Sequence, residues 1–100
     1  MIHIPTSRRK LTIEGFLFYI VVNENMRNST VKVRIYPVET KTSFCDIFFT
    51  GQAIFGTNFH LPSVCSILTK YAIRKWDHRK EKQIVTIEDG NFLIEKLILH

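Results

Sequence analysis

Apolar and polar residues alternate along the first half of the chain, which is the pattern of β-strands with one buried face. The clearest run is residues 31–36, where Val and Ile at odd positions face one side and Lys, Arg and Tyr at even positions face the other. Residues 10–23 are rich in β-branched and aromatic side chains. Their second half is apolar at both parities, which favours one strand that is either central in the sheet or covered by a partner, with a bend or bulge at Gly15.

Two further strand segments follow in the sequence. Residues 44–49 are predicted as a third strand and residues 53–55 as a short fourth strand, with a turn at 50–52; one bulged strand is the alternative. Ahead of the first strand, residues 1–9 contain Pro5 and Ser7 and are predicted as a flexible N-terminal arm.

The clearest helix pattern begins at Pro62 and Ser63, which are favourable residues for a first turn. An apolar stripe follows at intervals of three and four residues, consisting of Val64, Ile67, Leu68, Tyr71, Ala72 and Trp76. The segment ends in cations that suit the negative end of a helix dipole, namely Lys75, His78, Arg79 and Lys80. We therefore expect one amphipathic helix.

The last segment fits two patterns. Residues 84–87 form a β run, and Asp89-Gly90 is a strong hairpin turn, so residues 92–99 are predicted to return as a strand. The apolar residues at 94, 97 and 98 also fit a helical face, but the turn needs a partner strand. The predicted fold is α+β: an antiparallel β-meander, one amphipathic helix packed on the sheet, and a C-terminal β-hairpin, in a single domain spanning residues 10–100.

Length and charge limit the classes of function that this chain could have. A chain of 100 residues is one domain, and its 14 Lys and Arg against 9 acids give a net charge of +5. That excess favours a polyanionic partner, although it also serves solubility. The longest apolar run, residues 16–22, is too short to span a membrane, so we expect a cytoplasmic protein without membrane contact. Two cysteines, Cys45 and Cys65, are expected to be reduced and buried.

Two groups of cations are candidate contacts for nucleic acid, either DNA or RNA. The first group follows the helix and its end: Lys70, Arg74, Lys75, Arg79 and Lys80. The second group, Lys32 and Arg34, lies on the exposed face of a strand beside Tyr36, which could stack on a base. The alternative is that these charges serve only the helix dipole and solubility.

Catalytic and metal chemistry have weak support in the sequence. Cys45, His60, Cys65 and His78 lack the close ligand pairs of a structural zinc site. Cys65 near a helix start with His60 nearby could form a nucleophile pair, but catalysis also needs an oriented base and oxyanion donors. Asp46 or Asp77 would orient a histidine only if the fold brings them together. We expect a non-enzymatic binding protein with no cofactor, no metal and no small-molecule substrate.

The apolar content exceeds what one helix can cover. A single helix shields only one face of such a sheet, so the other face would expose Phe and Ile. We therefore expect a homodimer, although a sheet curled into a small barrel would also bury this surface. The second functional hypothesis is a protein-interaction or inhibitor-type module that acts through this apolar face.

Overall fold

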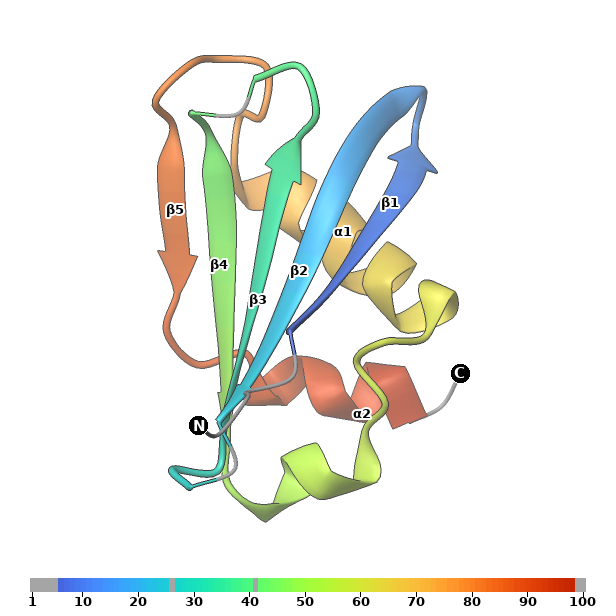
Figure 1. The fold of residues 1–100 in the computed structure, drawn as a ribbon, viewed down its shortest axis with the longest axis vertical. Helices are drawn as coiled ribbons and strands as arrows, with labels where there is room; N and C mark the ends of the chain where they lie inside the picture. The colour runs from blue at the N-terminus through green and yellow to red at the C-terminus, as the bar shows by residue number, and fades with distance from the viewer. Residues whose placement is uncertain (1–5, 26, 41, 99–100) are drawn as a thin grey trace.

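The alternating segments pair into one five-stranded mixed sheet, and the fold is α+β (Figure 1). The computed structural model describes residues 6–25, 27–40 and 42–98. The strands lie in sequence order: β1 (Thr6–Ile13), β2 (Phe16–Asn25), β3 (Thr30–Pro37), β4 (Phe44–Thr50) and β5 (Ile84–Ile87). Neighbours are antiparallel except β4 and β5, which run parallel.

A hairpin replaces the single first strand that the sequence predicted. Glu14 and Gly15 both adopt positive φ, 52° and 84°, which matches the tight turns that join antiparallel strands. Ile13 therefore pairs with Phe16 across the turn. Residues 6–9, predicted as part of a flexible arm, belong to β1. The rest of that predicted arm, residues 1–5, lies outside the described residues.

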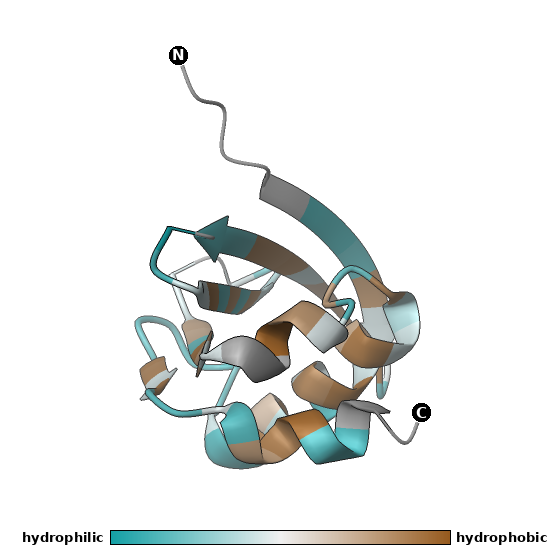
Figure 2. Cartoon of the chain, turned by 90° about the horizontal axis from the view of Figure 1, so that it is seen from below, coloured by the Kyte–Doolittle hydropathy of each residue, from teal (hydrophilic) through white to brown (hydrophobic). Residues whose placement is uncertain are grey.

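The core lies between one face of the sheet and the helices, which pack on the same side (Figures 1 and 2). Apolar stretches, brown in Figure 2, occur in both layers. The inward residues of the three central strands are each at most 1% exposed: Phe18, Ile20, Val22, Val31, Val33, Ile35, Cys45, Ile47 and Phe49. The predicted alternation of β3 is thus confirmed.

Helix α1 (Pro62–Lys75) starts where the sequence predicted and buries Val64, Leu68 and Ala72 of the predicted stripe. It ends before His78, because Trp76 takes an extended backbone and turns its indole into the core, where Nε1 donates to the Gln83 carbonyl at 3.0 Å. Arg79 and Lys80 therefore lie in a loop, not on the helix. That loop is attached to the β3–β4 connection, since the buried Ser43 hydroxyl donates to the Lys80 carbonyl.

Residues 53–55, predicted as a short strand, lie instead in the 3₁₀ helix η1 (Gln52–Gly56). Gly51 has a φ of 85°, so the chain leaves the sheet direction at this point. Ile54 remains buried beneath β4 and contributes to the core from helical geometry.

The predicted C-terminal hairpin is wrong, and its helical alternative is right. The chain returns through α1 to the start of β4, where the Phe44 amide donates to the Gln83 carbonyl, so β5 must run parallel to β4. After β5 the chain forms η2 (Asn91–Leu93) and α2 (Ile94–Ile98), burying Leu93 and Ile94.

Gly90 explains why the Asp-Gly pair is present without a hairpin. Its amide donates to the Phe48 carbonyl at 2.7 Å, and a Cβ at this position would lie 2.5 Å from Ile47 Cγ2. The Asn91 side-chain amide then accepts from the Thr50 amide and donates to the Thr50 carbonyl. The glycine is needed for close approach to β4, not for a turn conformation.

Candidate nucleic-acid interface

The two predicted groups of cations lie on opposite sides of the molecule. Lys70, Arg74 and Lys75 are exposed on α1, away from its buried stripe. Lys32 and Arg34 alternate with the buried residues of β3 and so project from the sheet face that the helices leave uncovered. A single bound strand cannot follow both groups without wrapping around the domain.

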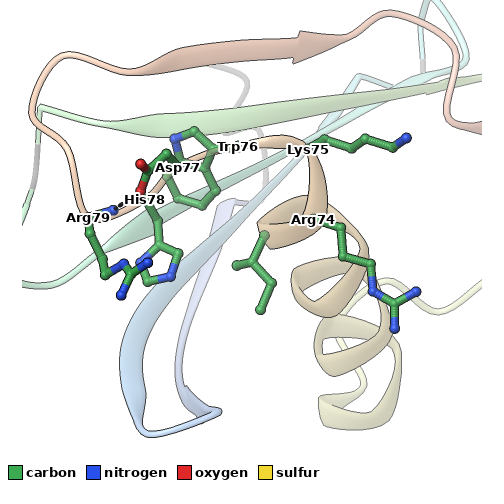
Figure 3. A pocket seen from close by; sticks show the side chains of 7 residues that line it. Arg74, Lys75, Trp76, Asp77, His78 and Arg79 are labelled. Atoms are coloured by element: carbon green, nitrogen blue, oxygen red, sulfur yellow. Dashed lines mark hydrogen bonds between the residues drawn. The ribbon is translucent and has the colours of Figure 1, made fainter.

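The two loop cations are separated from the helix cations as well. In Figure 3, Arg74 and Lys75 leave the end of α1 on one side, whereas Arg79 lies toward the β1–β2 hairpin. The Arg79 guanidinium lies 6.0 Å from the centre of the Phe16 ring. Lys80 Nζ is 3.9 Å from an Asp77 carboxylate oxygen, both side chains being well exposed. The predicted basic helix end is thus divided, with Arg79 lying apart from Arg74 and Lys75.

A different cluster forms on the uncovered side of the sheet, which we call the open face. The strand register sets Arg8 beside Val21, Val21 beside Arg34, and Arg34 beside Asp46 in one row across four strands. Adjacent rows carry the remaining members of the open face: Lys10, Tyr19, Lys32, Tyr36, Phe44 and Phe48. Cations and aromatic rings are therefore interleaved.

The centre of the open face is a pair of tyrosines on neighbouring strands. The rings of Tyr19 and Tyr36 have centroids 5.5 Å apart and planes inclined by 43°. Arg8 lies with its guanidinium 4.6 Å from the centroid of the Tyr19 ring, and Lys10 Nζ lies 5.9 Å from it. These cation–π contacts hold positive charge next to flat aromatic surface that is still half exposed.

Arg34 is already engaged within the protein. Its Nε and Nη2 donate to the two oxygens of Asp46 at 2.8 and 2.9 Å, and the guanidinium also covers the Phe44 ring at 4.0 Å. The hydrogen bond to Asp46 raises the pKa of Arg34. Because the Asp46 side chain is only 8% exposed, this pair is a fixed part of the surface. Arg34 positions Phe44 and offers little net charge to a ligand.

The remaining open-face cations carry the available charge. Among the described residues, Arg8, Lys10 and Lys32 have no carboxylate within 4.0 Å. Of these, only Lys32 was predicted as a contact. Arg8, Lys10 and Tyr19 join this surface because the turn at Glu14-Gly15 pairs β1 with β2, whereas the sequence predicted one strand over residues 10–23. The Glu-Gly pair is the signal that marks the hairpin.

Neither cysteine has the lowered thiol pKa of a catalytic nucleophile. Cys45 and Cys65 are buried free thiols, and burial raises the pKa of Cys45 to about 12. Burial also raises the pKa of Cys65, whose thiol donates to the Phe59 carbonyl at 3.3 Å. His60 Nε2 instead lies 2.9 Å from Glu24 Oε1. A catalytic thiol needs the opposite pKa direction.

The described part of the chain shows neither a metal-binding cluster nor a membrane-spanning helix. Its His, Cys, Asp and Glu side chains form no group of three or more placed to hold a metal ion. None of its helices has both the length and the apolar character needed to cross a membrane. Comparison of the chain with protein-family models, with curated proteins and with solved structures found no match.

Proposed function

We propose that this protein is a non-enzymatic binding domain for single-stranded nucleic acid, with the open face as its binding surface. The observation that carries the proposal is the interleaving of half-exposed aromatic rings with cations on one side of a sheet. Phosphates attract the cations, and unpaired bases stack on the rings. DNA and RNA share both groups, so either can bind in this way.

The ring pair supplies the sequence-independent part of the affinity. Base stacking on an aromatic side chain contributes about 1–3 kcal/mol per base. Tyr19 and Tyr36 offer two adjacent rings on neighbouring strands. Arg8 and Lys10 lie beside them on β1, and Lys32 lies two rows away on β3, beyond Arg34. A backbone passing over the rings therefore meets positive charge in two directions.

Single strands suit this surface better than duplexes do. A duplex hides its base faces, so the tyrosine rings would gain no stacking partner. Recognition of duplex DNA usually places a helix in the major groove, but α1 packs against the other side of the sheet. The cations of α1 have fewer rings beside them; Lys75 Nζ lies 5.9 Å from the Tyr71 ring.

The same charges argue against self-association through the open face. Two copies docked face to face would bring Arg8, Lys10 and Lys32 against their symmetry mates, and like charges in an interface cost free energy. The predicted homodimer therefore needs another surface. Light scattering at low and high salt tests this: a dimer that forms only in high salt and is abolished by Tyr36→Lys would contradict the argument.

The direct test is fluorescence anisotropy with labelled oligonucleotides of about ten nucleotides. Tyr19→Ala should weaken binding about tenfold by removing one stacking surface. Lys10→Ala should also weaken binding and should reduce the salt slope by about 0.7. Lys70→Ala and Arg74→Ala are matched controls on the far side and should leave the affinity within about twofold.

Two outcomes overturn the proposal. One is the absence of salt-sensitive binding to any single-stranded DNA or RNA. The other is a reversed ranking, in which Arg74→Ala weakens binding and Tyr19→Ala does not. Selective binding of an acidic protein, with no binding of oligonucleotides, would favour the protein-interaction hypothesis instead.

A further inference from the structure

A pocket of about 450 Å³ lies at the end of the sheet, directly beyond the tyrosine pair. Leu17 stands two residues before Tyr19 on the same side of β2, whereas Phe16 and Pro37 have the parity of the side that the helices cover; all three line the pocket. The Val38 amide donates to the Leu17 carbonyl at 3.0 Å, so this rim is held by the sheet ladder. A nucleic-acid strand that crosses the open face along β2 and β3 would have to pass around this end of the sheet to reach this rim pocket.

One wall of the rim pocket is aromatic and well supported. The Phe16 side chain is 40% exposed, and Arg79 lies with its guanidinium 6.0 Å from the ring centroid. Behind it, the buried His78 ring makes edge contacts with Phe16 and Phe18, at centroid distances of 4.7 and 4.9 Å. Burial, together with nearby Arg79, lowers the pKa of His78 and so favours the neutral imidazole.

The pocket also carries one carboxylate and one guanidinium. Glu39 comes from the β3–β4 connection and Arg79 from the loop after α1, and both line the cavity. Among the described residues, neither side chain has an ion-pair partner within 4.0 Å. The Arg79 loop is fixed in place, because Ser43 bonds both the Lys80 carbonyl and the Gln83 amide.

We infer that the rim pocket receives a guanine base from the strand bound on the open face, an inference that rests on the proposed function. Guanine presents two adjacent donors, N1–H and N2–H, which fit the two oxygens of Glu39. It also presents two adjacent acceptors, O6 and N7, which fit the guanidinium of Arg79. Phe16 supplies the ring surface on which the base stacks.

The other bases satisfy only part of this set. Adenine lacks O6 and has no N1–H to give the carboxylate. Cytosine offers an amino group to Glu39 but presents no N7 and O6 pair to Arg79. Uracil would place a carbonyl oxygen near a carboxylate, which is repulsive. The pocket therefore favours guanine, because this base can bind Glu39 and Arg79 at the same time.

The test compares oligouridine with the same oligomer carrying one guanine, one adenine or one inosine, using fluorescence anisotropy. One guanine should raise the affinity about tenfold over oligouridine. Adenine should give little gain, and inosine, which lacks the N2 amino group, should fall between them. Glu39→Gln should reduce the affinity ratio of the guanine oligomer to oligouridine to about one, because the amide offers one acceptor and one donor where guanine presents two donors.

Glu81→Gln is the matched control, since Glu81 is an exposed carboxylate that does not line the rim pocket. It should keep the full guanine preference. Thermal unfolding of both variants checks that the fold is retained, as expected for exposed side chains.

The two proposals fail in different ways. If no oligomer binds, the proposed function is wrong. If all oligomers bind equally, the nucleic-acid function stands and the guanine inference is overturned. A guanine preference that persists in Glu39→Gln also overturns the inference, because the carboxylate would then play no part in recognition.

Discussion

The two faces of the sheet are built by the same strands but differ in burial and in charge. On the covered face, Phe49 and its inward neighbours are essentially inaccessible to solvent and belong to the hydrophobic core. On the open face, Phe48 and Tyr19 are half exposed and lie beside cations or polar groups. The alternation of β-strands lets one segment serve both purposes.

The difference shows where free energy of folding and free energy of binding reside. Burial of the covered face removes apolar area from water and stabilises the domain. The open face retains aromatic area that folding does not bury, so that area remains available to a ligand. Substitutions on the first face should therefore change stability, and substitutions on the second should change binding with little loss of stability.

The largest expected effect comes from adjacent phenylalanines on β4. Phe49→Ala should lower the free energy of unfolding by about 4 kcal/mol, because it leaves a cavity in a close-packed core. Phe48→Ala, one residue earlier on the open face, should cost about 1 kcal/mol or less. Urea denaturation measures both; equal losses would show that the two faces are equally buried.

The next prediction concerns the ion pair between Arg34 and Asp46 on the open face. Arg34→Ala should destabilise the fold by about 2–3 kcal/mol, because it leaves the Asp46 carboxylate buried without its bidentate partner. Lys32→Ala, two residues earlier on the same strand, should change stability by less than about 0.5 kcal/mol. If the two variants melt alike, the Arg34–Asp46 pair is not structural.

Glycine substitutions test the close approach behind β4. Gly90→Ala should destabilise the fold by about 2 kcal/mol, because the new methyl group would overlap Ile47 Cγ2. Gly56→Ala is the control, since a Cβ there meets no atom within 4 Å. A Gly90→Ala variant as stable as wild type would show that the β5–η2 segment can move away from β4.

The smallest expected effect is a pH dependence of the free energy of unfolding that comes from His78. Its pKa is lowered in the folded state, mainly by burial, so the unfolded chain binds the proton more readily. The stability that this neutral ring contributes is complete above about pH 6.5, the ordinary value for histidine, and is lost as pH falls through the lowered folded-state pKa.

His78→Phe isolates that contribution because other ionisable groups cancel between the two proteins. The ring keeps its aromatic neighbours Phe16 and Phe18, and the variant should lose less stability than wild type as pH falls from about 7 to about 5. Parallel stability curves for the two proteins would contradict the assignment of a neutral buried His78.

Several features were readable because their signals are local. The alternation at 31–36 predicted β3 and its two faces, and Pro62 with its apolar stripe predicted the start and buried side of α1. The predicted C-terminal hairpin was wrong because the Asp89-Gly90 pair looks the same in the sequence whether its glycine forms a turn or allows a close approach of the backbone. Only the position of Ile47 distinguishes the two uses.

The candidate site was predictable only in part. Lys32, Arg34 and Tyr36 were expected on an exposed strand face, and they lie there. That Arg34 is taken up by Asp46, and that Arg8, Lys10 and Tyr19 join the same surface, depends on the register of four strands. Register is a relation between distant segments, which periodicity within one segment does not contain.

The amino-acid sequence by itself determined which residues favour burial, where α1 begins, and the excess of positive charge. These properties depend on side-chain chemistry and on short-range spacing. Only the tertiary structure decided that the cations of α1 and of β3 lie on opposite sides, that β5 runs parallel to β4, and that the last segment is helical. Those outcomes follow from the crossover of the chain through α1 and from packing against β4, which are contacts between residues far apart in the sequence.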